Sequence, residues 1–377
     1  MPRVTQRLLT PDVARGFMLL LIALANVTWW TSDTDLSVAA TADRAWVFVR
    51  TLFIDGRAYP LFSMLFGFGL ATIASRYGDA TEARRVLRRR GWWLLAFGVV
   101  HAVVFAGDVL GAYGLAAVLL AGLIAKQRHR LLIVLGVGIA VVSTATYYGG
   151  SMAYADGMEE SSPPPASSAW LDLPVVGELA TWAFITVGSV VMTAVVPCIV
   201  IGVFIQRSGI LAEVARHRRL LGVTAVVGLA LAAALAVPAA RAELAGERLV
   251  GVDALAGVGS YPGGIGWLAA IAVIFAGRAE QARAAASTLA AIGKRSMTGY
   301  IGQTILFAPT FALLKAFDMA ESITPVVAAG MAVLVWLIVG ACCVALERAG
   351  RPGPFEALNK RLIYGKRAVT ASSGAAA

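Results

Sequence analysis

Long apolar runs constrain this chain more than any other feature of its sequence. Roughly ten runs approach twenty residues, the length that a helix needs to cross a hydrocarbon core of about 30 Å. Only 14% of the residues are charged and 59% are hydrophobic. Soluble globular domains have about 25% charged and about 45–50% apolar residues. The sequence therefore predicts an all-α, polytopic membrane protein of about ten transmembrane helices.

The spacing of the runs predicts one transmembrane domain over residues 1–346 and a cytoplasmic interfacial segment with a flexible tail over 347–377. No small-residue cleavage site follows the first run, so it is expected to remain as a helix and not to be removed as a signal peptide. The expected spans are 12–30, 57–75, 91–107, 109–125, 131–148, 175–205, 219–240, 264–277, 296–314 and 323–346.

The basic residues predict the orientation. With the N-terminus inside, 25 of the 32 Lys and Arg residues fall on the cytoplasmic side and six on the outer side. Positive charge is enriched in cytoplasmic loops, so both termini are expected inside and the acidic 156–172 loop outside. The net charge of +10 is explained in this way, without nucleic acid as a partner. Membrane lipid is the expected surrounding.

Polar residues inside apolar spans carry the functional information, because ordinary membrane helices are apolar throughout. In the first span, Asp12, Arg15 and Asn26 share one narrow stripe at 100° per residue. Two explanations fit this stripe. It could be an ion pair plus one interhelical amide bond, or it could line a polar path through the membrane.

A second polar group, Asp55-Gly56-Arg57, precedes Pro60 at the outer side and predicts a shaped turn there. A third consists of His101 and Asp108. Among three histidines, His101 is the one in the outer half of an apolar span, which makes it the best candidate for a general base. Asp108 lies on nearly the same helical face but about 10.5 Å further along the axis. A direct His101–Asp108 bond therefore requires the helix to break near Gly107.

A fourth group begins at Lys294 and Arg295 and continues through Ser296, Tyr300 and Gln303, which form one polar face. The two cations could hold a phosphate or could act only as cytoplasmic anchors. The three cysteines lie in apolar runs and are expected to be small core residues. No second histidine stands at metal-ligand spacing from His101, so no metal site is expected.

Together these segments resemble the YeiB-like family of bacterial membrane proteins. The resemblance implies a multi-pass protein of the bacterial cytoplasmic (inner) membrane. It is carried by Asp12, Arg15-Gly16-Phe17, Asn26, Asp55-Gly56-Arg57, Phe62-Ser63, Phe66-Gly67-Phe68-Gly69, the Arg84–Arg90 cluster, His101, Gly107-Asp108-Val109-Leu110, Tyr113, Gly293-Lys294, Tyr300, Gln303, Gly353-Pro354, Glu356 and Tyr364-Gly365.

Through its first two helices this family is similar to the transmembrane acyltransferases that include heparan-α-glucosaminide N-acetyltransferase. The shared positions are Asp12, Arg15, Gly16 and Asn26. That resemblance implies acyl transfer, most simply of an acetyl group, from cytoplasmic acetyl-CoA or another acyl-CoA to a sugar or glycan hydroxyl or amine outside. The sugar acetyltransferases carry a catalytic histidine shortly after the Asn. This sequence has none between Asn26 and Arg57, so His101 is expected to replace it.

The expected roles follow. His101 would deprotonate the acceptor, Asp108 or Asp55 would stabilise the imidazolium, and Asn26 would donate to the developing oxyanion. The residues expected to bind the acyl-CoA are Arg15, Arg57, Arg88, Arg89, Lys294, Arg295, Tyr300 and Gln303.

A transporter or exporter of a small polar solute is the alternative, because buried Asp, Arg and His mark transport paths as readily as active sites. The sequence shows no inverted repeat that would favour a transporter. It leaves the acceptor and the oligomeric state open, a homodimer included.

Overall fold

The computed structural model describes residues 8–31, 34–36, 38–105, 107–155, 175–247, 249–275 and 280–365. Throughout this part of the chain the regular elements are helices and no strand occurs, which confirms the all-α prediction. The 156–172 loop, expected outside, and the tail beyond residue 365 lie outside the described residues.

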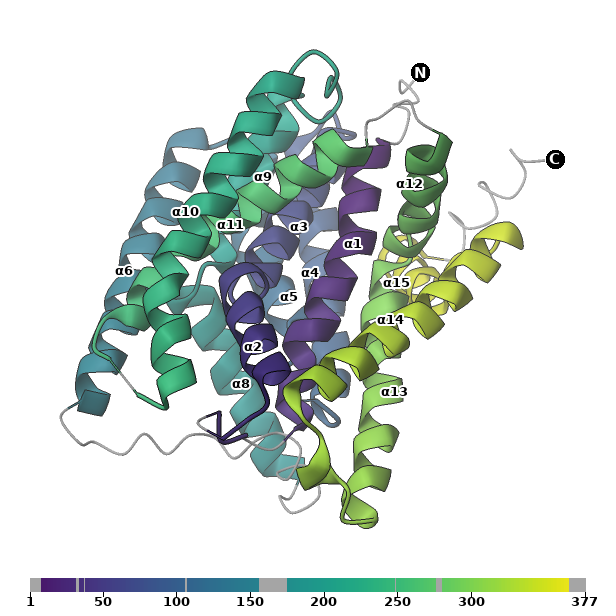
Figure 1. Cartoon of the computed structure of the whole chain (residues 1–377). Helices are drawn as coiled ribbons and strands as arrows, with labels where there is room; N and C mark the ends of the chain where they lie inside the picture. Colours follow the sequence, from purple (N-terminus) through teal and green to yellow (C-terminus); the bar gives the residue numbers. More distant parts are fainter. Residues whose placement is uncertain are drawn as a thin grey trace.

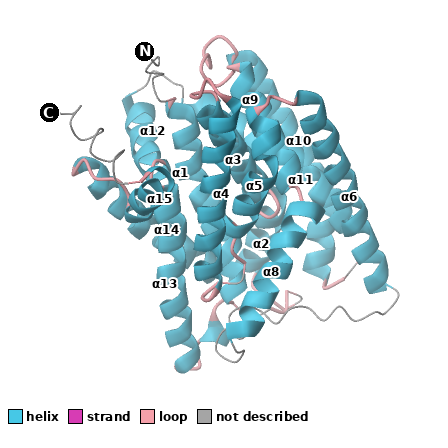
Figure 2. Cartoon of the chain, turned by 180° about the vertical axis from the view of Figure 1, so that it is seen from behind, coloured by secondary structure: helices cyan, strands magenta, loops and turns pink. Residues whose placement is uncertain are grey.

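The helices form a single bundle whose arrangement is shown in Figures 1 and 2. In chain order they are α1 Leu9–Asn26, η1 Val27–Trp30, α2 Thr41–Phe53, α3 Ala58–Ala74, α4 Ala80–Ala102, α5 Leu110–Ala125, α6 His129–Ala155, α8 Val175–Met192, α9 Val195–Ser208, α10 Arg218–Ala245, α11 Val252–Phe275, α12 Glu280–Gly293, α13 Ser296–Ala316, η2 Ala320–Ser322, α14 Pro325–Arg348 and α15 Pro354–Tyr364.

Within the described residues, seven helical segments are long and apolar enough to cross a membrane, or eight if the bent pair α8 and α9 forms one span. The prediction of a multi-pass membrane protein is therefore confirmed, whereas the count of ten stays a prediction. Two of the expected spans, 91–107 and 109–125, correspond to helices that are not both long and apolar enough to be counted. The arginines in the first half of α4 make it too polar, and α5 has only 16 residues.

Two expected spans had wrong bounds. The 175–205 span begins at Val175 as expected, but it is bent by 55° between α8 and α9. The 264–277 span is the last part of α11, which begins at Val252 and passes through Pro262. The 91–107 span begins at Ala80 and ends at Ala102. In α4 the periodic pattern of the arginine-rich half continues the helix toward Asp79, whose carboxylate accepts hydrogen bonds from Thr81 N and Glu82 N.

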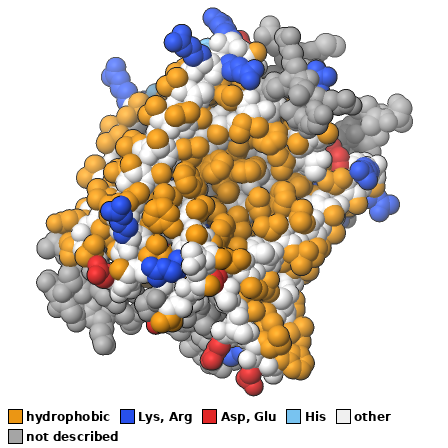
Figure 3. Space-filling model, viewed as in Figure 1, with side chains coloured by type: hydrophobic (Ala, Val, Ile, Leu, Met, Phe, Trp, Pro, Cys, Tyr) orange, Lys and Arg blue, Asp and Glu red, His pale blue; other side chains and the backbone are white. Residues whose placement is uncertain are grey.

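The bundle has an inner and an outer set of helices. In α1 with η1, 67% of an apolar stretch of 18 residues is buried inside the bundle, against 28% in α10 and 17% in α6. Large apolar side chains are exposed on the outer set, for instance Val226 on α10 and Val134 on α6. Figure 3 shows a broad hydrophobic band across the middle of the molecule, the surface that a bilayer would cover.

Helices of the inner set approach closely where glycines face a neighbouring backbone. A Cβ atom at Gly67 of α3 would overlap the Ile199 carbonyl of α9, and one at Gly202 of α9 would overlap the Met64 carbonyl of α3. This reciprocal contact fits the rule that small residues bring membrane helices together when lipid gives no hydrophobic drive for association.

The two ends of the bundle differ in charge. α1 begins at the upper end in Figure 1, which we call the N-terminal end, and runs toward the opposite end. Most of the Lys and Arg side chains visible in Figure 3 gather toward the upper and right edges, and most Asp and Glu lie toward the lower edge. α4 runs parallel to α1, because the ring of Phe105, just after α4, stacks on Trp30, just after α1.

The cysteines divide into two kinds. Cys198 and Cys343 are buried, as expected of small core residues. Cys342 is exposed on the surface of α14, so its assignment to the core was wrong. Residues 342 and 343 point about 100° apart on one helix, and only one of them can face the bundle.

Candidate functional site

The pairing of His101 with Asp108 is the central feature of the site. α4 ends at Ala102, one residue after His101, and α5 begins at Leu110. The connecting turn, which contains Gly107, reverses the chain and returns Asp108 to the imidazole. The His101 Nδ1 to Asp108 Oδ1 distance is 2.8 Å. The helix break that a direct bond requires is therefore present.

The partners of the pair fix how the imidazole is protonated. Asp108 Oδ2 also accepts hydrogen bonds from Gly111 N at 2.8 Å and Trp182 Nε1 at 3.3 Å. Since the carboxylate is an acceptor, Nδ1 of a neutral His101 carries the proton. Nε2 is then the acceptor for the Thr304 hydroxyl of α13, at 2.9 Å. Hydroxyl, imidazole and carboxylate lie in the order found where a base activates a hydroxyl.

The pair is buried among close neighbours. His101 is 7% exposed and Asp108 is 2% exposed. The Tyr300 ring lies 5.1 Å from the imidazole, between ring centroids, and the Phe105 ring lies 5.9 Å away. A Cβ atom at Gly98 would stand 2.6 Å from Asp108 Oδ2, so only glycine allows the carboxylate to lie against α4 here. The low polarity of this environment strengthens both hydrogen bonds.

A cavity of about 1020 Å³ opens beside the pair, in the half of the bundle away from the N-terminal end. Gly107, Asp108 and Val109 form part of its wall, whereas His101 does not line it. Its remaining wall is rich in aromatic rings, carboxylates and hydroxyls. These include Trp29, Tyr59, Tyr113, Tyr147, Tyr261, Asp55, Glu243, Glu247, Asp253, Ser63, Thr51, Ser143, Thr144, Thr146, Ser189, Thr193 and Ser260.

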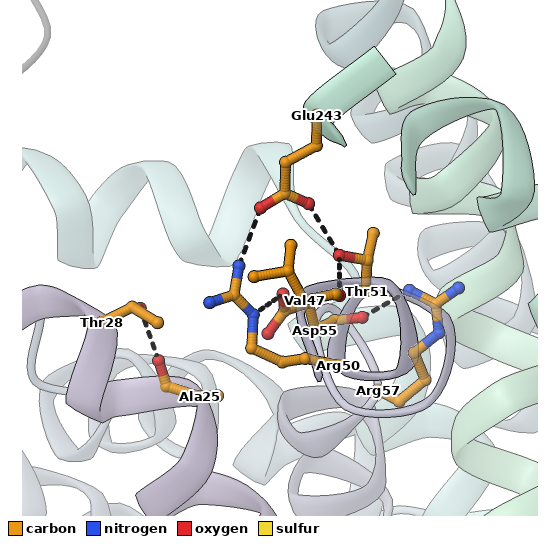
Figure 4. A network of polar contacts seen from close by, with 8 residues as sticks. All are labelled: Ala25, Thr28, Val47, Arg50, Thr51, Asp55, Arg57 and Glu243. Atoms are coloured by element: carbon orange, nitrogen blue, oxygen red, sulfur yellow. Dashed lines mark hydrogen bonds and ion pairs between the residues drawn. The ribbon is translucent and has the colours of Figure 1, made fainter. Parts of the chain in front are cut away.

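An ion-pair network stands in the wall of this cavity and joins α2 to α10 (Figure 4). Arg50 Nε contacts Asp55 Oδ2 and Arg50 Nη2 contacts Glu243 Oε1, each at 2.8 Å. Thr51 donates to the other oxygen of Glu243 at 2.7 Å. One arginine thus serves two carboxylates, and Arg57 supplies a second positive charge in the same wall.

Arg57 is the cation most deeply placed at this wall. Its side chain is among the largest that are fully buried, and it donates to the backbone oxygens of Asp55 and, at 2.9 Å, Ala232. Its Nε is buried and has no hydrogen-bond partner among the described residues. The expected turn around Gly56 is present, with a backbone φ of 69° that favours glycine.

The other expected catalytic residues lie near the cavity but apart from His101. Asp55 pairs with Arg50 and makes no hydrogen bond to His101, so Asp108 is the carboxylate that contacts the imidazole. Asn26 is 5% exposed, and its Oδ1 accepts a hydrogen bond from the Tyr59 hydroxyl. Its amide nitrogen has no partner among the described residues and is free to donate.

The residues expected to hold acyl-CoA fall into separate environments. The Tyr300 ring is tilted by 54° against the His101 ring, and its hydroxyl accepts a hydrogen bond from Val109 N at 3.3 Å. Gln303 donates to the Leu19 carbonyl at 2.9 Å and ties α13 to α1. Arg88 and Arg89 are exposed on α4.

Lys294 and Arg295 contact Glu347 at the end of α14. The Lys294 Nζ to Glu347 Oε1 distance is 2.5 Å, and the Arg295 Nη1 to Glu347 Oε2 distance is 2.6 Å. Arg295 is also 4% exposed, which is unusual for a cytoplasmic anchor. A phosphate at either cation would have to compete with the Glu347 carboxylate.

Arg15 lies at the N-terminal end of the bundle, away from the cavity wall. Its Nη1 contacts Asp12 Oδ1 at 3.0 Å, which is the ion pair expected from their spacing, and its Nη2 donates to the Leu65 carbonyl of α3 at 3.0 Å. The expected polar stripe of α1 is therefore divided, because Asn26 belongs to the cavity side and Arg15 to the other end.

Several contributors were not found from the sequence. Thr304 had a signal, because it lies four residues after Tyr300 and so shares its helical face. Trp182 of α8 and Glu243 of α10 had none, since their roles depend on helices that pack together from distant parts of the chain. Among the described residues, no group of three or more His, Cys, Asp or Glu side chains could hold a metal ion.

The fold and the cavity define a multi-pass helical membrane protein with a polar chamber in one half. Residues 205–366 match a family model described as "Protein of unknown function (DUF418)", a family associated with YeiB-like membrane proteins. A curated relative, an uncharacterized 39.9 kDa protein encoded in the amylase 3′ region of Bacillus acidopullulyticus, is 31% identical over 109 residues.

That alignment covers 29% of this chain and 31% of the relative, so the chain spans about a third of the protein it matches. No solved structure matches the chain. The comparisons support the YeiB-like resemblance and carry no activity. The DUF418 match includes Tyr300, Gln303 and Thr304 but begins after His101.

Proposed function

We propose that this protein is a membrane-embedded acyltransferase. It takes an acyl group, most simply acetyl, from acyl-CoA on the N-terminal side of the bundle and transfers it to an acceptor in the cavity. The single observation that carries the proposal is the Thr304–His101–Asp108 array, with distances of 2.9 and 2.8 Å. A buried imidazole oriented by a carboxylate and holding a hydroxyl on its free nitrogen is the arrangement that general-base catalysis needs.

The proposed chemistry follows from this geometry. Because neither His101 nor Thr304 lines the cavity, the acceptor hydroxyl or amine has to displace Thr304 from Nε2. His101 then removes the acceptor's proton as the acceptor attacks the acyl carbon. The bond from that carbon to sulfur breaks, and the CoA thiolate receives the proton from the imidazolium. Asp108 stabilises the imidazolium between these two transfers. The amide nitrogen of Asn26 would donate to the oxyanion.

The cavity supports a sugar or glycan as the acceptor. Its volume lies at the upper end of the range of ligand pockets, about 300–1,000 Å³. Aromatic rings such as Trp29 and Tyr261 offer flat apolar faces, and carboxylates such as Asp253 accept hydrogen bonds from hydroxyl or amine groups. Asp55 and Glu243 stand in the same wall and would accept hydrogen bonds from the bound acceptor before transfer.

The proposed orientation places the N-terminal end in the cytoplasm of a bacterium and the cavity on the outer side of its inner membrane. The charge distribution supports this, because basic residues concentrate in cytoplasmic segments. A transporter would use the same cavity without chemistry, and the test is chosen to separate the two.

The test compares His101→Ala with His217→Ala, a matched control at the start of α10 and away from the cavity. Purified protein in lipid nanodiscs is given acetyl-CoA and amino-sugar or glycan acceptors, and the released CoA thiol is measured. His101→Ala should bind acetyl-CoA normally and lose transfer by about a hundredfold or more, the scale of general-base removal. His217→Ala should match the wild type.

Two outcomes contradict the proposal. Equal activity of His101→Ala and the control would remove His101 from the chemistry. Absence of acceptor-dependent CoA release in the wild type, together with accumulation of an amino sugar inside protein-loaded vesicles, would favour the transporter.

A further inference from the structure

The arginine cluster of α4 contains one member that differs from the rest. Arg84, Arg85, Arg88 and Arg89 are exposed, as expected for a solvated helical face. Arg90 turns toward the bundle and is only partly exposed. Its guanidinium carbon lies 5.9 Å from the centroid of the Phe66 ring of α3. The sequence cannot reveal this difference, because the five arginines are chemically identical.

The guanidinium of Arg90 lacks a hydrogen-bond acceptor. Its Nε is buried and unpartnered, and no hydrogen bond or ion pair joins Arg90 to any described residue. The residue as a whole keeps partial exposure. An uncompensated cation at this depth is costly, because desolvation is not repaid by a partner.

A second guanidinium reaches the same turn of α3. Arg15 of α1 donates to the carbonyl of Leu65, the residue before Phe66, and its Nη2 would lie 3.3 Å from a Cβ atom at Gly69. Arg15 and Arg90 act on each other electrostatically as like charges. Because Asp12 pairs with Arg15 at 3.0 Å, the net positive charge at this place comes from Arg90, which has no acceptor.

The nearby acidic group does not neutralise Arg90. Glu356 of α15 is within electrostatic range, but its carboxylate accepts from Met297 N at 2.7 Å and Thr298 N at 3.0 Å, and from the Thr298 hydroxyl. It caps the start of α13 and is fully engaged there. Tyr364, also of α15, is the other ionisable neighbour, and a neutral phenol can donate to an anion.

We infer that Arg90 and Arg15 form a binding site for a phosphate group. Arginine presents a planar fork of donors that matches phosphate oxygens, and the weak hydration of guanidinium suits a partly buried site. The acyl-CoA identity of the ligand rests on the proposed function, whereas the anion site does not. A phospholipid headgroup carries the same chemistry and is the second source that the experiment must distinguish.

The experiment compares Arg90→Gln with Arg85→Gln in the full-length protein. The control removes the same charge from the exposed face of the same helix, five residues earlier. Each protein is placed in nanodiscs of phosphatidylcholine only, and its affinity for coenzyme A is measured by calorimetry. Arg90→Gln should weaken binding about tenfold or more, the scale of a lost hydrogen bond to a charged group. Arg85→Gln should weaken it less than about twofold, and only through long-range charge.

A conservative variant and a second probe sharpen the result. Arg90→Lys keeps the charge but not the fork, so its affinity should fall between those of the wild type and Arg90→Gln. Thermal stabilisation by nanodiscs containing phosphatidylglycerol tests the lipid source. If that stabilisation depends on Arg90 while coenzyme A binding does not, the site belongs to a lipid phosphate.

The outcomes for the phosphate site do not depend on the proposed function, and a melting-temperature measurement separates them from a folding defect. Without ligand, Arg90→Gln should melt at or above the wild-type temperature, because it removes an uncompensated charge. A lower melting temperature would show that Arg90 has a structural role instead. Unchanged responses of Arg90→Gln to both coenzyme A and phosphatidylglycerol would overturn the site even if acyl transfer is observed. An Arg90-dependent response would support it even if no transfer is found.

Discussion

Replacing Asp108 with Asn tests the hydrogen-bond logic of the site most directly, because it changes one atom and leaves the shape. In the wild type, Oδ2 accepts from Gly111 N and Trp182 Nε1, and Oδ1 accepts from His101 Nδ1. An Asn side chain has one oxygen and one NH₂ group. It can satisfy the Gly111 and Trp182 donors or the His101 donor, but not all three.

The magnitudes decide which arrangement the variant adopts. Turning the new NH₂ toward Gly111 and Trp182 would leave buried donors unsatisfied, at about 1–3 kcal/mol each. Turning it toward His101 requires only that the ring proton move from Nδ1 to Nε2, and the Thr304 hydroxyl can rotate to accept it. We therefore expect Asp108→Asn to lose about 1 kcal/mol of stability, the net difference between a charged and a neutral hydrogen bond.

Activity should fall much further than stability. With its proton on Nε2, His101 cannot accept one from an acceptor, so acyl transfer should drop by about a hundredfold to ten-thousandfold, the range for losing a base through the wrong tautomer. The assay is CoA release, paired with ¹⁵N spectra of His-labelled protein. Because the chain has three histidines, the spectra should contain three resolvable side chains.

Asp318→Asn is the matched control. Asp318 is exposed in a turn with a φ of 54°, a conformation that Asn adopts equally well, so neither activity nor tautomer should change. The reasoning is refuted if Asp108→Asn retains activity within about tenfold of the wild type, or if His101 keeps its Nδ1 proton in that variant.

Two further predictions concern Thr304 and the topology. If the acceptor displaces Thr304 from Nε2, Thr304→Val should keep at least about a tenth of the activity and lose about 1 kcal/mol of stability, whereas Thr304→Ser should match the wild type. A loss as large as that of His101→Ala would instead make the hydroxyl part of the chemistry. For the topology, Ser161→Cys in a variant whose three native cysteines are replaced by alanine should react with an impermeant thiol reagent on intact cells. Reaction only after permeabilisation would reverse the proposed orientation.

The site shows where reasoning from the sequence reaches its limit. His101 and Asp108 could be paired in advance only on condition that the helix breaks, since an unbroken helix keeps them about two turns apart. The break itself depends on the turn after Ala102 packing against Trp30 and Tyr300. Asn26 and Arg15 could be placed on one stripe of α1, but the stripe does not indicate that they serve different ends of the bundle.

For a similar reason, the sequence could not indicate which of the cations pair with an acidic residue and which lack a partner. Helical periodicity fixes the angle between Arg88, Arg89 and Arg90 but not which of them faces the neighbouring helices. Lys294 and Arg295 look like free charges in the sequence, because their partner Glu347 lies more than 50 residues later. The charge pattern therefore identified the basic end of the bundle, whereas packing decided that Arg90 is the arginine that faces the neighbouring helices.

The sequence by itself determined that this is a helical membrane protein, which end of the bundle is basic, and which polar residues lie at membrane depth. Those properties follow from length, hydropathy and charge counted along the chain, which are local quantities. The tertiary structure alone decided that Thr304, 203 residues from His101, completes the imidazole array, and that Arg90 lacks an acceptor. Hydrogen-bond partners must lie within about 3 Å in space, and that distance is set by how helices from distant segments pack.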